Sequence, residues 1–267
     1  MRMQLNESSK QTLLCDSKVL GKAWKKTYNG YFGNQKNMQK FIQIFLPHIP
    51  AHSKRVSILY PASANGKMGE LLVKALEKQG VDTNLTIFDI SEKHLAQNHN
   101  KKTKKIHGDW LSLKMKKKFD VIIVRSSLDY FSNEKLQVNA LKKVKNWLKP
   151  AGVFFNQAAS LSNLTERNLA DRIYSSNSKI GKRHFQCKDD IAAIYSKAGF
   201  ATLKKMGNAP PLVVTEKEHI QRYGIKASEV EKIQKLINRI PSRKRPNITV
   251  TKNGYRMKFL FPVYLAR

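Results

Sequence analysis

Between residues 56 and 158 the chain alternates short apolar runs with amphipathic segments of helical length, and this alternation restricts the fold more than any other feature. The apolar runs are VSILY (56–60), LTIFDI (85–90), FDVIIVRSS (119–127) and GVFFNQA (152–158). The segments between them include GELLVKALEKQG (69–80), SEKHLAQNH (91–99) and NEKLQVNALKKVKNWLKP (133–150). Strands that alternate with helices form parallel sheets covered by helices on both faces. We therefore predict an α/β fold with a mostly parallel sheet.

The rest of the chain continues the pattern with two interruptions. A helix is expected over DDIAAIYSKAGF (189–200), a strand over ATLKKMGN (201–208), and a long closing strand over GYRMKFLFPVYLAR (254–267). From Pro210 onward a polar, helix-like stretch begins with two prolines, as a loop would. We predict an N-terminal helical segment (1–50) and one domain (51–267) with insertions near 161–186 and 209–247.

The chain is strongly basic, with 50 Lys and Arg against 19 Asp and Glu and a net charge of +31. A field of this sign attracts polyanions, so nucleic acid is a candidate partner. The excess of basic residues is spread along the whole sequence, with denser clusters at 101–105, 114–118 and 243–245. Such a spread is equally typical of a solvated surface, so charge alone does not distinguish the two.

Several classes of protein are disfavoured by what the sequence lacks. No apolar run approaches the roughly 18 residues of a membrane-spanning helix, and the first residues lack the apolar core of a signal peptide. We therefore expect a cytoplasmic protein with no integral membrane segment. Cys15, Cys187 and the seven histidines form no metal-binding spacing, so no metal site is expected. The oligomeric state stays open.

The stretch ILYPASANGKMGELL (58–72) turns from an apolar run into a helix through small residues. Ala62, Ser63 and Ala64 allow a ligand to approach the backbone closely, and Gly66 allows a positive φ. In open α/β sheets ligands bind at the carboxyl ends of the strands, where the strand order reverses. Asp89 ends the second apolar run and can accept hydrogen bonds from two ribose hydroxyls. Together these features predict an adenosine-type cofactor.

Two cofactor families share that description. Ala64, Gly66 and Gly69 imitate the dinucleotide fingerprint with alanine at its first glycine. A pyrophosphate normally requires the full glycine set, and a catalytic acid and substrate region of a dehydrogenase are not visible. The fingerprint therefore favours an adenosyl cofactor over NAD.

The order of motifs resembles the class I S-adenosylmethionine-dependent methyltransferases over about residues 56 to 208, with the closing strand at 255 to 266. The resemblance is carried by five motifs, ILYPASANGKMG, TIFDIS, IHGDW, FDVIIVRSSLDYF and LKKVKNWLKPAGVFFNQ. It implies a Rossmann-like, mostly parallel seven-stranded sheet with helices on both faces and an antiparallel last strand. An N-terminal helical lid and a C-terminal helical insertion complete the expected architecture. The activity implied is methyl transfer from S-adenosylmethionine, and the layout near the C-terminus resembles branches that act on small molecules.

The resemblance also assigns roles to individual residues. It implies that Asp89 binds the ribose, that Asp109 and Trp110 contact the adenine, and that Arg125 and Ser126 line the methionine arm. Arg125 is unusual beside a cationic sulfonium and is a candidate partner of the cofactor carboxylate. The full set implied to bind the cofactor is Tyr28, Tyr31, Tyr60, Ala62, Ser63, Asn65, Gly66, Asp89, Ile90, Asp109, Trp110, Arg125 and Ser126. Asp129 and His184 are the candidates for a general base.

The sequence departs from the family at its first motif. Tyr60 stands where members usually carry Asp or Glu, and the first glycines of the motif are replaced by alanines. RSSLDYF follows the fourth apolar run in place of the Asn-Pro-Pro-Tyr type of motif, which argues against methylation of DNA bases. The alternative hypotheses are a cofactor-impaired or non-enzymatic Rossmann-like module that binds RNA or another polyanion, and an RNA methyltransferase.

Overall fold

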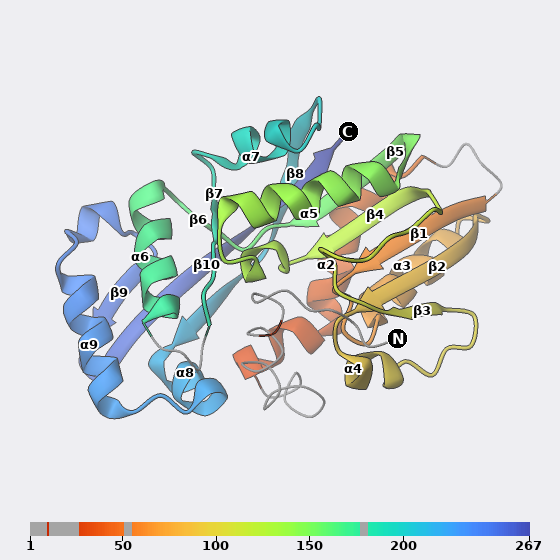
Figure 1. Ribbon diagram of the computed structural model, residues 1–267. Coiled ribbons are helices and arrows are strands. Elements are labelled where there is room, and N and C mark those ends of the chain that lie inside the picture. Colours follow the sequence, from red (N-terminus) through yellow and green to blue (C-terminus); the bar gives the residue numbers. More distant parts are fainter. Residues whose placement is uncertain (1–9, 11–26, 51–54, 177–180) are drawn as a thin grey trace.

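The computed structural model describes residues 10, 27–50, 55–176 and 181–267, with the side chains of 27–29 excepted. Their strands form one sheet in the order β3-β2-β1-β4-β5-β10-β6-β7, and β8 and β9 pair with β10 (Figure 1). The strands are β1 (Arg55–Pro61), β2 (Asp82–Asp89), β3 (Lys104–His107), β4 (Phe119–Arg125), β5 (Leu148–Gln157), β6 (Ser160–Leu161), β7 (Gln186–Cys187), β8 (Leu203–Thr215), β9 (Ile248–Thr251) and β10 (Gly254–Ala266).

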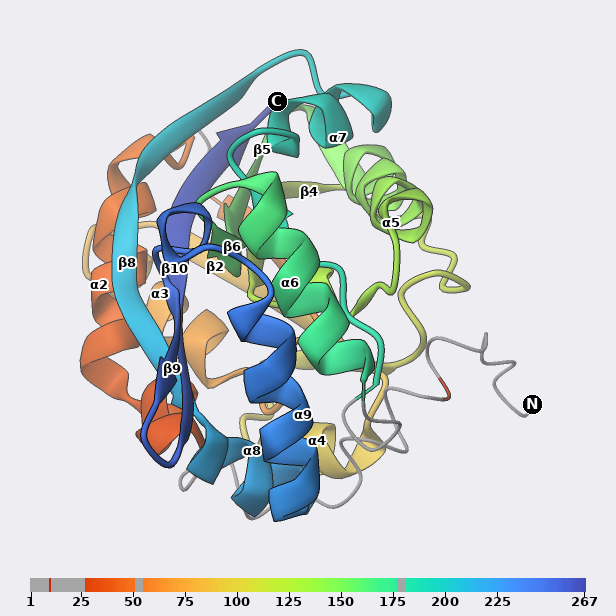
Figure 2. The ribbon, with the colours of Figure 1, turned by 90° about the vertical axis from the view of Figure 1, so that its left-hand side faces the viewer.

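Helices cover both faces of this sheet. α2 and α3 lie on one side and α5 and α7 on the other (Figure 2). The α-helices are α2 (Gln35–Phe45), α3 (Lys67–Glu77), α4 (Glu92–Ala96), α5 (Glu134–Trp147), α6 (Leu164–Ser175), α7 (Ile191–Lys197), α8 (Glu216–Tyr223) and α9 (Ala227–Asn238). The 3-10 helices are η1 (Thr27–Gly33), η2 (Leu46–His48), η3 (Leu128–Tyr130) and η4 (Ser242–Lys244).

The predicted fold class is confirmed by the pairing of the strands. β1 lies between β2 and β4 and is parallel to both, so Ile58 pairs with Leu85 on one side and with Val121 on the other. β5 continues the parallel sheet, and β10 runs antiparallel to β5. The strand order reverses between β1 and β4, which places the ligand-binding edge at the carboxyl ends of those strands.

Within the described ranges the sheet has ten strands rather than the seven expected. β6 and β7 have two residues each, and β9, like β3, has four. Runs this short carry no alternation that a sequence pattern can detect, because a strand signal needs about four to eight residues.

The expectation of a loop from Pro210 is wrong, because β8 continues through both prolines to Thr215. β8 pairs with β10 alone among the described strands, so it is an edge strand, where the missing amide of a proline is tolerated. The register shifts here, since Phe261 pairs with Ala209 and Phe259 with Leu212. The two prolines therefore lie in a bulge of the edge strand.

The far ends of β8 and β10 carry a helical cap made of α6, α8 and α9 (Figures 1 and 2). His219 of α8 is fully buried there, and its two ring nitrogens lie 2.5 Å from the Tyr255 hydroxyl and 3.2 Å from the Tyr174 hydroxyl. The hydrogen bonds join α8 to β10 and to α6. The cap is therefore attached to the sheet by a buried polar contact as well as by apolar packing.

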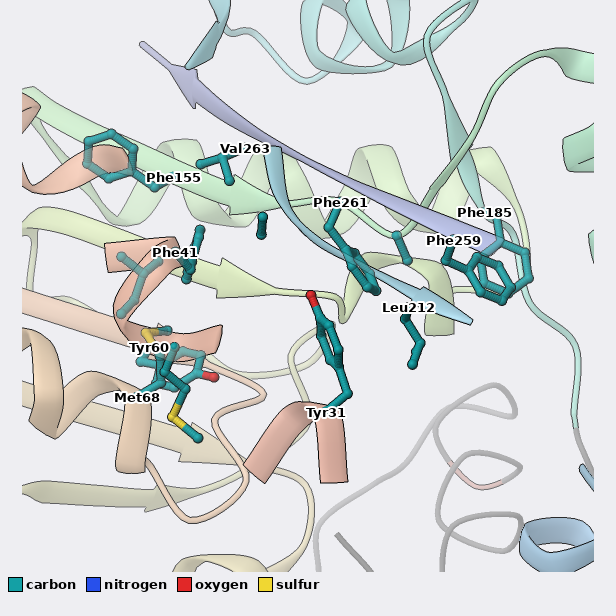
Figure 3. Packing of buried hydrophobic residues seen from close by; sticks show 14 of the residues in the cluster. Tyr31, Phe41, Tyr60, Met68, Phe155, Phe185, Leu212, Phe259, Phe261 and Val263 are labelled. Atoms are coloured by element: carbon teal, nitrogen blue, oxygen red, sulfur yellow. The ribbon is translucent and has the colours of Figure 1, made fainter. Parts of the chain in front are cut away.

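One of the two hydrophobic clusters runs without a break from the parallel part of the sheet into this cap. Figure 3 shows the cluster from Phe155 and Val263 to Phe259 and Phe185, with Tyr31 lying beneath Phe261. The ring centroids of Tyr31 and Phe261 are 5.2 Å apart, in a stacked arrangement. Through Tyr31 the N-terminal η1 packs directly beside the ligand-binding edge.

Candidate functional site

The turn after β1 has the backbone shape of a glycine-rich loop although its first small residues are alanines. Ala62 and Ala64 have φ values of 47° and 50°, and Gly66 follows with φ of 75°. An L-residue in this left-handed region loses about 1–2 kcal/mol through the contact of its Cβ with the backbone. Contacts elsewhere in the protein must therefore hold the turn in its shape.

Those contacts come from β2 and from the segment after α4. The Ser63 amide donates to the Phe88 carbonyl at 3.1 Å, and the Ala64 amide donates to Asp89 Oδ2 at 2.7 Å. The side-chain amide of Asn98 donates to the Asn65 carbonyl at 2.8 Å. Asn98 was not among the predicted site residues, because it is distant in sequence and lies in no motif. The turn is thus fixed to the ends of its neighbouring elements before any ligand binds.

Gly66 is required at its position for two reasons. Its positive φ favours glycine, and a Cβ there would lie 2.8 Å from Ile87 Cδ1. Gly66 is the N-cap residue of α3. Because it has no side chain, its backbone and the start of the helix can lie close to β2. The predicted role of this glycine in the turn therefore has a steric basis.

Asp89 lies at the end of β2 with 6% of its surface exposed. One carboxylate oxygen accepts the Ala64 amide, and the other accepts the Ser91 amide at 2.8 Å. His94 Nδ1 also lies 3.5 Å from Oδ1. A carboxylate has about four acceptor sites, so at least one is left beside these three groups. Asp89 can hold the turn and accept a ribose hydroxyl at the same time.

The IHGDW motif follows β3 beside the end of β2. His107 Nε2 lies 3.0 Å from the Ile90 carbonyl, and Asp109 Oδ1 accepts the Leu111 amide at 2.9 Å. Trp110 is 5% exposed, and its indole N–H donates to the Ala140 carbonyl of α5. Its ring packs edge-on against Phe131, 5.6 Å away between centroids. The Gly108 amide donates to the Asp89 carbonyl at 3.1 Å, so Ile90 and Asp109 both lie close in the chain to residues at the end of β2. The indole of Trp110 is part of the core under α5.

Arg125 is the last residue of β4 and Ser126 follows it, and both are held by Gln157 at the end of β5. The Ser126 amide donates to the Gln157 carbonyl at 2.8 Å, and Arg125 Nε donates to Gln157 Oε1 at 3.3 Å. Ser126 has φ of 49°, a third non-glycine residue in the left-handed region. Gln157 is fully buried and was missed, because the sequence pattern marked it only as the end of a strand.

The phenol rings of Tyr60 and Tyr31 lie near Arg125. Burial raises the pKa of Tyr60 to about 12, the nearby guanidinium of Arg125 lowers it and the charge of Asp89 raises it, so Tyr60 is neutral at physiological pH. Burial also raises the pKa of Tyr31, whose hydroxyl donates to the Pro210 carbonyl of β8. Figure 3 shows Tyr60 beside Met68 and Tyr31 beneath Phe261. Tyr28 belongs to η1, and its side chain lies outside the described part of the chain.

Asp129 and Tyr130 lie in η3, one turn further from β4. The guanidinium of Arg183 lies 3.3 Å from the centroid of the Tyr130 ring and 4.0 Å from Asp129. Arg222 of α8 donates to the Tyr130 hydroxyl at 3.3 Å. Both arginines are 5% exposed. Segments from both insertions therefore meet at Tyr130. No sequence motif indicated that either arginine would lie there.

His184 has both ring nitrogens engaged inside the protein. Its Nδ1 lies 3.1 Å from Asp171 Oδ2, and its Nε2 lies 3.0 Å from Arg167 Nη1. Its backbone amide donates to the Asp129 carbonyl. The two candidate bases are therefore brought together by the backbone, and the imidazole of His184 serves as a link between α6 and the strand that follows it.

The described residues contain no group of three or more His, Cys, Asp or Glu side chains placed to hold a metal ion. Cys187 is buried with its thiol 3.3 Å from Asp190, and Cys15 lies outside the described residues. In that same part of the chain, no helix has the length and apolar character needed to cross a membrane.

Comparison with known proteins agrees with the geometry. Residues 59–152 match the sequence model of a methyltransferase domain family. Among solved structures, a Bacillus halodurans protein assigned to the methyltransferases is 15% identical and has a TM-score of 0.64, with 86% of this chain and 97% of that one covered. A comparison with curated protein sequences finds no match.

Two further structures share the fold and were determined with S-adenosylhomocysteine. The plantazolicin methyltransferase BpumL is 16% identical with a TM-score of 0.53, covering 98% of this chain and 97% of that one. A Haemonchus contortus phosphoethanolamine N-methyltransferase is 12% identical with a TM-score of 0.53, covering 91% and 57%. Residues 59–152 are therefore similar to a methyltransferase domain, and the chain shares the fold of these solved methyltransferase structures.

Proposed function

We propose that the protein is a methyltransferase that binds S-adenosylmethionine at the carboxyl ends of β1, β2 and β4 and methylates a small molecule. The observation that carries this proposal is the turn after β1. Its left-handed alanines are held by Asp89, and that carboxylate keeps at least one acceptor site for a ribose. The protein therefore keeps the backbone of the binding turn without the usual glycines.

The residues at this edge fit the three parts of the cofactor. Asp89 suits the ribose, Ile90 and Asp109 lie beside it for the adenine, and Arg125 and Ser126 lie at the opposite side of the turn for the methionine end. A buried Arg125 nitrogen, Nη2, has no hydrogen-bond partner among the described residues. A ligand with an acceptor group would supply the hydrogen bond that this buried donor lacks. We assign Tyr31, Tyr60, Ala62, Ser63, Asn65 and Gly66 to the walls and backbone contacts of the same site.

S-adenosylmethionine supplies a methyl group already activated by the sulfonium, so the protein has to position the acceptor and exclude water. Tyr130, with Arg183 and Arg222 around it, lies next to the end of β4, where an acceptor would reach the methyl group. Asp129 is the remaining candidate for a base, because both nitrogens of His184 are engaged. A small acceptor is supported by the similar fold of enzymes crystallised with a pentazolic desmethylPZN analogue and with phosphomonomethylethanolamine.

Calorimetric titration with S-adenosylmethionine and S-adenosylhomocysteine tests the proposal, with Asp89→Asn as the key variant. Asparagine keeps one acceptor oxygen and removes the charge. The affinity for both compounds should therefore fall by about 10- to 100-fold, which corresponds to the loss of one or two charge-assisted hydrogen bonds. Asp82→Asn is the matched control, since Asp82 begins the same strand and is exposed in a pair with Arg55.

Equal affinities of the wild type and both variants would contradict the assignment of Asp89. A folded wild-type protein that binds neither compound would refute the enzyme and favour the polyanion-binding module. In that case, titration with RNA at several salt concentrations would measure how much of its affinity is electrostatic.

A further inference from the structure

Arg125 is a buried cation that no carboxylate among the described residues pairs with. It is 7% exposed and lies at the end of β4, where the strand order reverses. Nη1 donates to the Phe32 carbonyl at 2.9 Å and Nε to Gln157 Oε1 at 3.3 Å. Nη2 is buried and has no hydrogen-bond partner in the part of the chain that the structure describes. Its hydrogen-bond acceptors are therefore neutral, and one nitrogen remains available.

This arrangement is costly for a protein that has no ligand. A charge removed from water loses several kcal/mol unless an opposite charge or a full set of hydrogen bonds replaces the solvent. The rings of Tyr31 and Phe32 lie 5.7 and 5.2 Å from the guanidinium, and each contact of this kind contributes about 0.5–2 kcal/mol. Burial lowers the pKa of Arg125, although a guanidinium stays protonated in proteins. The aromatic contacts offset only part of the lost hydration.

Arg167 shows how the same protein satisfies a buried arginine that serves the structure. It is 9% exposed, close to the value for Arg125. However, its Nη1 lies 3.1 Å from Asp190 and its Nε 3.9 Å from Asp171, so two carboxylates neutralise it. Arg125 has the burial of Arg167 and lacks the carboxylates.

The neighbouring residue at the end of β1 does not supply a counter-charge either. Tyr60 is 5% exposed and stays a neutral phenol, in the position where the resembling family usually has an acid. An acid there would suit the ammonium of an amino acid, whereas a guanidinium beside a phenol suits its carboxylate. The charge at this end of the site is therefore positive.

We propose that Arg125 binds a carboxylate of the ligand through Nη2 and so selects ligands that carry one. This inference rests on the proposed function. The carboxylate belongs either to the methionine end of the cofactor or to the methyl acceptor, and these two sources share the same chemistry. Arg125 supplies the binding charge, while Gln157 and the Phe32 carbonyl fix the direction in which the guanidinium points.

Two adenosine ligands separate the sources. S-adenosylhomocysteine carries the carboxylate and 5′-methylthioadenosine lacks the whole amino-acid part. If the cofactor is the source, Arg125→Met lowers the affinity for S-adenosylhomocysteine by about 10- to 100-fold and leaves that for 5′-methylthioadenosine unchanged. Arg125→Lys keeps the charge without the planar fork of the guanidinium, so its affinity for S-adenosylhomocysteine should lie between those of the wild type and Arg125→Met.

If the methyl acceptor is the source of the carboxylate, wild type and Arg125→Met bind S-adenosylhomocysteine equally well, and the same holds for 5′-methylthioadenosine. A second titration then tests whether Arg125 binds the carboxylate of an acceptor. Benzoate is added to the protein saturated with S-adenosylhomocysteine, and its binding is followed by saturation-transfer NMR. The wild type should then show benzoate binding that Arg125→Met abolishes. Absence of any difference in both titrations overturns the proposal.

Thermal unfolding distinguishes a binding role from a structural one. Arg125→Met should leave the melting temperature of the ligand-free protein unchanged or raised, because it removes a buried charge without a counter-charge. Arg167→Met is the matched control. It should lower the melting temperature, since it leaves Asp171 and Asp190 without their cation. It should also leave the ratio of the affinities for S-adenosylhomocysteine and 5′-methylthioadenosine unchanged. A wild type that binds neither adenosine ligand refutes the proposed function itself, whereas a wild type that binds both with no dependence on Arg125 or on benzoate refutes only this inference.

Discussion

Ala62 and Ala64 show that a backbone shape can persist after the residues that usually produce it have been replaced. The sequence marked the missing glycines as a departure from the family, and the structure has left-handed backbone at both positions all the same. The amides of Ser63 and Ala64 are bonded to the end of β2, so tertiary contacts impose the conformation. Asn98 and Gln157 belong to the same site without any motif, since only the fold brings them there.

These alanines predict an unusual response to glycine. Ala62→Gly and Ala64→Gly should each leave the free energy of unfolding unchanged or raise it by up to about 1 kcal/mol, because relief of left-handed strain outweighs the entropy that glycine adds to the unfolded chain. Ala75→Gly in α3 is the control and should destabilise by about 1 kcal/mol. Urea denaturation measures all three. A loss at Ala62 and Ala64 equal to that at Ala75 would show that the turn carries no such strain.

At the scale of elements, the helices and strands predicted between 56 and 158 are all present, because each has a complete pattern of apolar residues. The wrong expectation at Pro210 arose because a proline pair is a strong turn signal, while its tolerance depends on β8 being an edge strand. The sequence of α8 likewise did not show that His219 would be buried between β10 and α6. Such partners are set by packing between distant segments.

The contact of α8 with β10 and α6 makes the protein sensitive to acid. Burial, and then the charges of Arg222 and Arg183, lower the pKa of His219 to about 3, against about 6.5 in an unfolded chain. The unfolded state therefore takes up a proton that the folded state refuses, and stability falls as the pH drops from 6.5 toward 3. By pH 5 the loss from this group is about 2 kcal/mol.

His219→Gln should remove this part of the pH dependence while keeping polar groups near Tyr174 and Tyr255. The measurement is the free energy of unfolding by urea at pH 7.5 and pH 5, compared between variant and wild type. His48→Gln changes an exposed histidine and should leave the wild-type pH dependence intact. If His219→Gln loses as much stability as the wild type between the two pH values, titration of His219 is not the cause.

At the scale of the whole molecule, the site assembles from parts that lie far apart in the chain. β1, β2 and β4 bring the turn, Asp89 and Arg125 to one edge, η1 adds Tyr31, and the two insertions bring Arg183 and Arg222 to Tyr130. The order of motifs was enough to predict the first three, because the family-like core determines where strand ends meet. The arginines of the insertions were not predictable, since nothing in their local sequence refers to the sheet edge.

A crystal structure of the protein with S-adenosylhomocysteine tests the central claim most directly. We expect the adenosine beside the turn after β1, with the ribose hydroxyls within hydrogen-bonding distance of the Asp89 carboxylate and the sulfur end directed toward Arg125. Ligand density at another place, or an empty turn in crystals soaked well above the dissociation constant measured in solution, would contradict it.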